Sequence, residues 1–212
     1  YNKDDREISV KSYARALKYN RYGELVFLSS ADGPYSCGEW ITISPSSFKL
    51  SPGEKKRLSV LVNVPEGEVG GRYANIVFDA VSVHDNPGTT QKTSSNVPFF
   101  LTIPGQLKEQ ATIVETNVLH QDEKGFRKFV VTFKNSGNIH LKPGGKILVK
   151  KIVNVEKKGE IEYVGDPVYE EAEEIAFNRV DGVVLPEGTR ELTAVCSIPL
   201  PDGDYSVEAE VD

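Results

Sequence analysis

The segment "ISPSSFKLSPGEKKRLSVLVNVPEG", residues 43–67, constrains the fold more than any other part of the chain. Apolar and polar residues alternate in it, a Pro-Gly pair interrupts the alternation, and Pro-Glu-Gly ends it. A period of two places successive side chains on opposite faces of a β-strand. One face of the second run therefore carries four apolar residues, which we expect to form the layer between two sheets. They are Leu58, Val60, Val62 and Val64.

The interruptions of this segment have the chemistry of sharp turns. Pro52 fixes φ, and Gly53 tolerates a positive φ, so the chain can reverse between two strands. Pro65 has no N–H to donate, and with Gly67 it ends the second strand. The segment is therefore interpreted as a core strand of a β-sandwich together with its two stops.

The rest of the chain shows little helical periodicity and many short alternating runs bounded by Gly, Pro, Asn and Asp, which is typical of an all-β sandwich. For the acidic segment 169–177 we expect one helical turn or an irregular crossing between sheets, with a solvated surface in place of a calcium site. The predicted strands follow a hairpin over 7–28 and span 39–44, 56–64, 72–83, 96–103, 111–119, 126–135, 145–155, 160–164, 190–198 and 204–211.

A repeat divides the chain. Residues 50–67 and 185–203 both run through Leu, a Pro/Gly turn, charged residues, an alternating strand and a Pro-acidic-Gly stop. A strand that begins with a tyrosine, Tyr73 or Tyr205, follows each copy. We therefore expect two related sandwich domains, residues 1–104 and 105–212.

The two copies have different surroundings. Fewer residues precede the first copy than the second within its domain, and no equivalent of strand 96–103 follows strand 204–211. We therefore expect the first domain to lack its first strands and the second its last strand. Two explanations stay open: the chain is part of a longer polypeptide, or another chain donates a strand. Because an unpaired apolar edge promotes aggregation unless it is covered, we expect a protein partner at the sheet edges.

Residues 40–83 resemble bacterial PapD-like immunoglobulin-type domains, which occur in periplasmic pilus chaperones and in many surface or secreted proteins. The matching features are Ser44-Pro45, the turn from Leu50 to Gly53, the apolar strand and Tyr73. Residues 130–149 resemble the early strands of such domains. The resemblance implies two tandem PapD-like immunoglobulin-like sandwiches located at a bacterial cell surface, in the periplasm or outside the cell. For assembly chaperones it also implies a basic anchor in the cleft, and no such pair can be placed on this sequence.

Charge and motif content exclude several classes of function. The net charge of −6 comes from interleaved acidic and basic residues, so no basic stripe is present for nucleic acid. No apolar run is long enough to span a membrane. His84, His120 and His140 form no metal-ligand spacing, and no nucleophile motif occurs. We expect no catalytic residues, cofactor or metal, and no enzyme activity.

The two cysteines, Cys37 and Cys196, fall in different predicted domains, so we expect no disulfide between them. Cys196 continues an alternating face with Leu192, Ala194 and Ile198, which predicts a core thiol.

Aromatic residues provide the one candidate binding site. They crowd the first 40 residues, and exposed Tyr and Trp side chains favour protein or carbohydrate surfaces. These candidates are Tyr13, Tyr19, Tyr22, Tyr35 and Trp40. Trp40 has a second interpretation, as the first residue of a strand that packs between sheets.

The sequence thus predicts a non-enzymatic structural, adhesion or assembly protein of the bacterial surface or periplasm, with donor-strand exchange in a pilus or filament as one form of assembly. Two alternatives stay open: a PapD-like periplasmic assembly chaperone, and a carbohydrate-binding accessory module.

Overall fold

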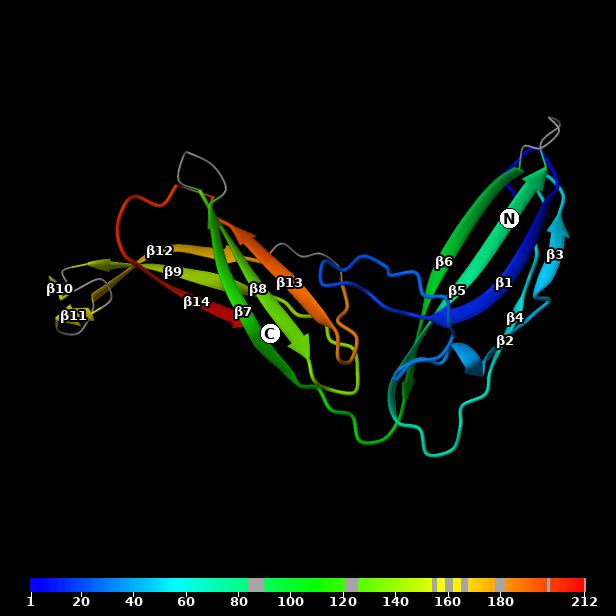
Figure 1. Cartoon of the computed structure of the whole chain (residues 1–212), viewed down its shortest axis with the longest axis horizontal. Helices are drawn as coiled ribbons and strands as arrows, with labels where there is room; N and C mark the ends of the chain where they lie inside the picture. The colour runs from blue at the N-terminus through cyan, green and yellow to red at the C-terminus, as the bar shows by residue number, and fades with distance from the viewer. Residues whose placement is uncertain are drawn as a thin grey trace. The chain divides into compact units, whose positions relative to one another are not determined.

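The computed structural model describes residues 1–83, 90–120, 126–153, 156–158, 162–164, 168–177, 182–197 and 199–211. Strands and one three-residue 3-10 helix, η1 (Gly38–Trp40), make up the secondary structure of this part of the chain. The chain forms two compact units, Tyr1–Tyr19 with Leu25–Lys108, and Asn20–Glu24 with Glu109–Asp212 (Figure 1). The all-β class with two sandwich units is confirmed. None of the described helices is long and apolar enough to cross a membrane.

The first unit contains two antiparallel sheets. A four-stranded sheet has the order β3-β1-β5-β6, and a two-stranded sheet pairs β2 with β4 (Figure 1). Their bounds are β1 Ile8–Ala16, β2 Ile41–Ser44, β3 Ser47–Leu50, β4 Ser59–Val62, β5 Gly70–Val83 and β6 Thr90–Ile103.

The register shows which residues of the larger sheet share a face. Ala14 of β1 lies opposite Ile76 of β5, and Ile76 lies opposite Val97 of β6. Because directly opposed residues of a sheet point the same way, these three side chains lie on one face. The buried apolar residues of this unit include Val10, Ala16, Ile43, Leu50, Ala74 and Ile76.

The inward face of β4 is less buried than the sequence predicted. Ile43 of β2 is 8% exposed, but its cross-strand partner Val60 is 44% exposed, as is Val64 beyond the strand. The physical reason is the narrowness of this sheet: in the described part of the chain, β4 pairs with β2 and with no second strand. The expectation that Val60 and Val64 fill the layer between sheets is therefore wrong for these residues.

The second unit also has two main sheets, with the orders β12-β9-β14 and β13-β8-β7, and a short hairpin of β10 and β11. Its core lies between them and contains Phe129, Val131, Ile147, Val149 and Ala194, each at most 1% exposed. The bounds are β7 Ala111–His120, β8 Arg127–Asn135, β9 Gly145–Val153, β10 Glu156–Lys158, β11 Glu162–Val164, β12 Val168–Ala176, β13 Thr189–Val195 and β14 Tyr205–Val211.

The acidic segment 169–177 lies almost wholly in β12, so the expectation of a helical turn or irregular crossing is wrong. The ladder of β12 with β9 continues past a bulge between Glu171 and Glu173. Lys146 of β9 pairs with Glu174 at 2.9 Å, while the next residue, Ile175, is 9% exposed and joins the core. Basic residues of the neighbouring strand thus offset the acidic side chains of β12 and make a strand of this composition possible.

Two buried asparagines hold equivalent corners of the two units. Asn135 is fully buried, and its side-chain amide donates to the carbonyls of Ile139 and Val184, each at 2.8 Å. Its side-chain oxygen accepts from the N–H of Gly137 at 2.8 Å. All three polar groups of this corner are therefore satisfied without water.

Asn2 makes the same set of bonds in the first unit. Its amide donates to the carbonyls of Arg6 at 2.7 Å and Leu50 at 3.1 Å, and its oxygen accepts from the N–H of Asp4 at 2.9 Å. The partners lie two, four and nearly fifty residues along the chain in both cases. The structural repeat thus includes a polar corner as well as the strand and turn read from the sequence.

Candidate functional site

The longest exposed strand edge of the described chain belongs to β6. β6 has 14 residues, all paired with β5, and lies at the end of its sheet. The register runs without a shift from Gly70 opposite Ile103 to Val83 opposite Thr90. By contrast, the ladders of β7 and β12, which also end their sheets, are interrupted by bulges. A long regular edge is the kind that pairs with another chain. We call this side of the strand the β6 edge.

Pro98 shows which backbone groups of β6 face outward. Within a sheet, proline is confined to edge strands, with the nitrogen turned away from the ladder. Pro98 lies opposite Asn75 inside the continuous β5–β6 register, so its nitrogen faces the β6 edge. Because successive residues point their N–H and C=O groups to alternate sides, Thr102 points its own to the same edge.

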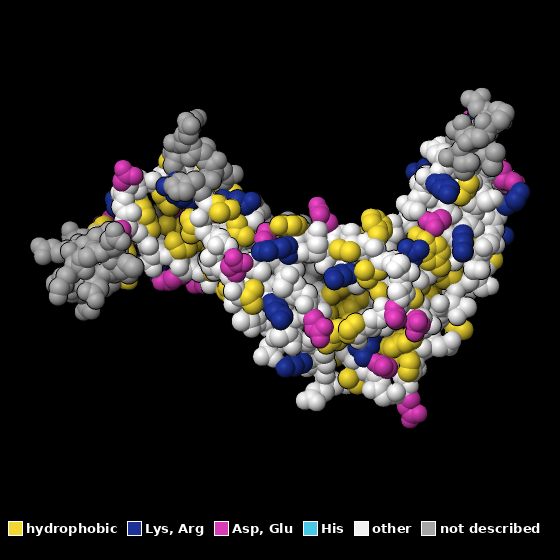
Figure 2. All heavy atoms as spheres, viewed as in Figure 1, with side chains coloured by type: hydrophobic (Ala, Val, Ile, Leu, Met, Phe, Trp, Pro, Cys, Tyr) yellow, Lys and Arg dark blue, Asp and Glu magenta, His cyan; other side chains and the backbone are white. Residues whose placement is uncertain are grey.

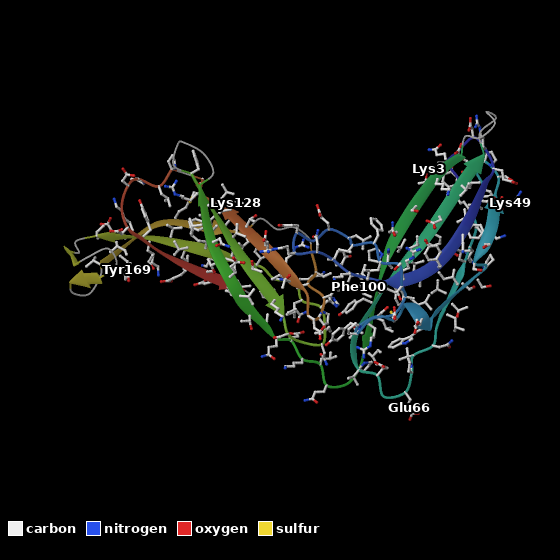
Figure 3. The ribbon with its side chains drawn as sticks, viewed as in Figure 1. Lys3, Lys49, Glu66, Phe100, Lys128 and Tyr169 are labelled. Atoms are coloured by element: carbon white, nitrogen blue, oxygen red, sulfur yellow. The ribbon has the colours of Figure 1, made fainter. Side chains whose placement is uncertain are left out.

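The carboxyl half of β6 adds apolar side chains to this edge. Val97 is 49% exposed and Phe100 is 37% exposed, although the ring of Phe100 packs edge-on against buried Tyr73 at 5.4 Å. Figure 2 shows hydrophobic side chains at the surface over β5 and β6, and Figure 3 labels Phe100. The amino half, residues 90–96, carries Thr, Gln, Lys, Ser and Asn. The edge therefore offers main-chain pairing throughout and apolar contacts at one end.

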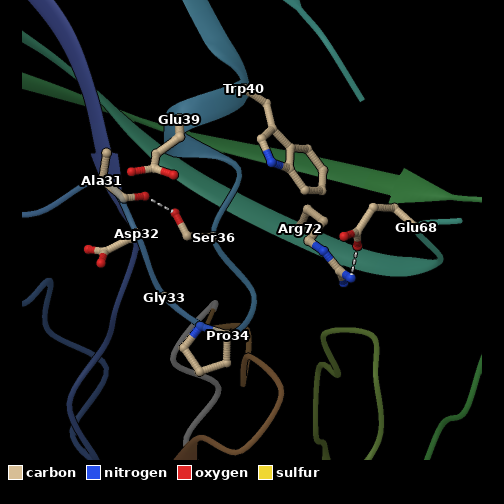
Figure 4. A pocket seen from close by; sticks show the side chains of 9 residues that line it. All are labelled: Ala31, Asp32, Gly33, Pro34, Ser36, Glu39, Trp40, Glu68 and Arg72. Atoms are coloured by element: carbon tan, nitrogen blue, oxygen red, sulfur yellow. Dashed lines mark hydrogen bonds and ion pairs between the residues drawn. The ribbon is translucent and has the colours of Figure 1, made fainter. Parts of the chain in front are cut away.

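A polar cavity of about 230 Å³ lies beside Trp40 in the same unit (Figure 4). We call it the Trp40 pocket. It is formed by the loop before η1, by η1 itself and by the start of β5. Its lining residues are Ala31, Asp32, Gly33, Pro34, Ser36, Glu39, Trp40, Glu68 and Arg72.

Arg72 is held rigidly at the wall of this pocket. One of its terminal nitrogens donates to the carbonyls of Val69 at 3.1 Å and Gly71 at 2.9 Å, and the other pairs with the carboxylate of Glu68. Its guanidinium carbon lies 5.8 Å from the ring centre of Trp40. A planar guanidinium makes these contacts together, which a lysine ammonium cannot do.

The five predicted aromatic site residues do not gather at one place. Tyr35 and Trp40 both lie near Arg72, with ring centres 5.7 and 5.8 Å from its guanidinium carbon. Trp40 belongs to η1 and does not begin a strand, and it is half-buried. No local pattern pointed to Arg72, Glu39 or Glu68, because the pocket joins two segments that are distant along the chain.

The other three tyrosines have separate surroundings. Tyr13 donates to Asp79 at 2.7 Å, and Arg15 lies over its ring. Burial, followed by this hydrogen bond, raises the pKa of Tyr13. Tyr19 is half-buried beside Leu25 in an isolated bridge, and Tyr22 is 61% exposed in the segment that groups with the second unit.

Both cysteines are buried and free, and the prediction of a core thiol is confirmed for Cys196. Burial is the main reason that the pKa of Cys37 rises to about 11, and burial also raises the pKa of Cys196. Ile198, expected on the face of Cys196, lies outside the described residues.

The histidines show no metal site in the described part of the chain. His84 and the side chain of His120 lie outside it. His140 lines a second cavity, of about 410 Å³, together with Phe133 and Lys142. Burial, and then the charge of Lys142, lowers the pKa of His140, so its ring is neutral at neutral pH.

No protein-family model and no curated protein matches the chain. Solved structures do. The chain is similar to the E. coli chaperone DraB, with 14% identity, a TM-score of 0.41, and coverage of 96% of this chain and 77% of that one. It is also similar to the YadV chaperone, with 10% identity, a TM-score of 0.45, and coverage of 99% and 81%.

A third similar structure is a chaperone–tip adhesion subunit complex, CsuC–CsuE, from the Csu pili of Acinetobacter baumannii. Identity is 15% and the TM-score 0.40, with 100% of this chain and 86% of that one covered. The predicted resemblance to pilus chaperones is confirmed as a likeness of fold.

Proposed function

We propose that the chain is a non-enzymatic assembly protein of the bacterial periplasm or cell surface, acting as a chaperone that captures an extended segment of another protein along the β6 edge. The observation that carries the proposal is the 14-residue β6 ladder, paired on one side and without a bulge. An extended peptide that adds a strand to such an edge gains affinity from main-chain hydrogen bonds and specificity from alternate side chains.

The energetics of the edge support binding of modest strength. About half of the β6 residues direct their backbone groups outward, and each new hydrogen bond contributes roughly 0.5–1.5 kcal/mol net. Ordering a flexible peptide costs roughly 1–2 kcal/mol per residue, so main-chain bonds alone leave little surplus. The exposed apolar positions Val97 and Phe100 supply the remainder, at roughly 25 cal/mol per Å² of apolar surface buried. Because Val97 and Phe100 lie three positions apart and point to opposite faces of the sheet, we expect a partner segment with apolar residues on both of its faces.

The test uses Thr102, which is exposed and directs its N–H to the β6 edge. Peptides selected from a random display library for binding to the chain are titrated against the wild type, Thr102→Pro and Thr102→Val. Thr102→Pro removes one outward donor and leaves the β5 ladder intact, so we expect binding to weaken about 5- to 10-fold with unchanged melting temperature. Thr102→Val keeps the N–H and should bind as the wild type does. Equal binding by both variants, or hydrogen-exchange protection away from β6, would refute the proposal.

A second candidate is a filament subunit that accepts a strand from another copy. The exposure of Val60 and Val64 on the inward face of β4 favours it. Such a subunit self-associates with rising concentration in sedimentation velocity, and Val60→Asp abolishes the association. A chain that stays monomeric while it binds peptides at β6 is a chaperone instead.

A further inference from the structure

We propose that the Trp40 pocket binds the cationic group of a lysine or arginine side chain presented by a partner protein. This inference goes beyond strand capture at the β6 edge and does not depend on it. It rests on the charge, the hydrogen-bonding capacity and the aromatic wall of one cavity in the first unit (Figure 4).

The charge of the lining favours a cation. Three carboxylates and one guanidinium line the pocket. Arg72 pairs with Glu68, so these two charges offset each other. Asp32 and Glu39 form no ion pair among the described residues, and both are exposed. A ligand with one positive charge is therefore attracted to the pocket, and an anion is repelled.

The hydrogen-bonding groups of the pocket also favour a cation. The Ser36 hydroxyl donates to the carbonyl of Ala31 and accepts from the N–H of Gly38 at 3.1 Å, so its own donor is already used. The terminal nitrogens of Arg72 donate to two backbone carbonyls and Glu68. In the part of the chain that the structure describes, no hydrogen bond reaches the carboxylates of Asp32 and Glu39, so both can accept from a ligand. A ligand rich in donors fits this set, and an ammonium has three donors while a guanidinium has five.

The indole of Trp40, which lines the pocket, lies beside a cation. The guanidinium of Arg72 already lies within 6 Å of the ring centres of both Tyr35 and Trp40. A second cation on the open side meets the same indole and the carboxylates of Asp32 and Glu39, while Glu68 offsets the repulsion from Arg72. The volume of about 230 Å³ is below that of sites for drug-sized ligands, so the pocket takes the end of one side chain.

The test exploits the fact that Trp40 is the one tryptophan of the chain. The indole N–H signal in a ¹H–¹⁵N spectrum therefore reports on this pocket without ambiguity. N-acetyl-lysine amide and N-acetyl-arginine amide are titrated, with N-acetyl-glutamine amide as the neutral analogue. We expect a saturable shift with the two cations at millimolar concentration, a weaker response at high salt, and none with the glutamine analogue.

Two charge-removing variants locate the site. Glu39→Gln and Asp32→Asn should each weaken binding of the lysine probe about 2- to 5-fold. Glu170→Gln, at an exposed position on β12 of the second unit, is the matched control and should leave binding unchanged.

Three results would overturn the inference: an equal response to the glutamine analogue, no effect of either pocket variant, or a saturable response to a neutral methyl glycoside in place of the cations. The last would assign the pocket to carbohydrate. The β6 variant Thr102→Pro should not alter the titration, so failure of strand capture and failure of this site are distinguishable.

Discussion

The turn before the repeated strand offers a reciprocal test of the structural repeat. Gly53 has φ of 73° and donates its N–H to the carbonyl of Asn2 at 3.0 Å. Glu187 has φ of 62° and donates to the carbonyl of Asn135 at 3.0 Å. The two residues hold the same place in the two units, and both lie in the left-handed region. We predict that Glu187→Gly stabilises the second unit and that Gly53→Ala destabilises the first.

The magnitude follows from two opposing terms. A residue with a Cβ pays roughly 1–2 kcal/mol in the left-handed region, and glycine does not. Glycine in turn loses more backbone entropy on folding, which destabilises the folded state by roughly 0.5–1 kcal/mol. A Cβ added at Gly53 meets no atom within 4 Å, so no steric clash adds to the cost there. The net change in the free energy of unfolding is about 0.5–1 kcal/mol at each site, with opposite signs.

The assay must report on each unit separately. Urea unfolding followed by the fluorescence of Trp40 reports on the first unit and measures Gly53→Ala. Hydrogen exchange at the buried strands of the second unit measures Glu187→Gly. Glu187→Ala is the matched control, because it removes the same exposed side chain and keeps the left-handed cost. It should change the free energy of unfolding by less than about 0.5 kcal/mol.

Two outcomes would refute the reasoning. If Glu187→Gly destabilises the second unit, the left-handed conformation of Glu187 carries no cost that glycine relieves. If Gly53→Ala leaves the first unit unchanged, the turn accommodates a Cβ by shifting out of the left-handed region, and the two turns are not equivalent.

Three further predictions concern buried polar groups and thiols. Asn135→Ala should cost about 2–4 kcal/mol in urea unfolding, because three buried hydrogen bonds are lost. Cys37, with a pKa of about 11, should react with iodoacetamide in a Cys196→Ala background roughly a hundredfold more slowly at pH 8 than a thiol with the ordinary pKa of 9.0. Hydrogen bonds from Ser94 and then Tyr13 lower the pKa of Asp79 in the folded state. The ionised carboxylate therefore stabilises the fold above pH 3.8, and this contribution is lost as the pH falls through the lower folded pKa. Ser94→Ala should raise the pH midpoint of acid unfolding.

Alternation of apolar residues was sufficient to predict the fold class and most strands, since a buried face imposes a period of two on the sequence. It was insufficient for β12. The acidic residues of this strand are compatible with a sheet because Lys146 and other residues of β9 lie beside them, and a partner strand is invisible to a local pattern. The prediction that Val60 of β4 is buried was wrong for a related reason. The pattern shows to which face Val60 points, and it does not show whether another layer covers that face.

The candidate site was predictable in part. Composition singled out Tyr35 and Trp40, because aromatic residues are enriched at binding surfaces. Arg72, which lies near both rings, comes from the start of β5, and its role depends on the backbone carbonyls of Val69 and Gly71 that the fold brings within reach. The equivalence of the corner asparagines Asn2 and Asn135 could not be predicted either. What the two share is a set of hydrogen bonds to carbonyls that are distant along the chain, and a single asparagine does not reveal such bonds in a sequence.

The place of β6 in its sheet favours it as the functional element. The strand order β3-β1-β5 of the first unit corresponds to β12-β9-β14 of the second, and the tyrosine-led strands β5 and β14 occupy matching places. β6 lies beyond β5, and no described strand lies at that place beside β14. β6 pairs with β5 along all 14 of its residues, and no described strand pairs with its other side. An extended segment of a second protein can pair there, because each added residue of edge adds backbone groups for the partner to meet.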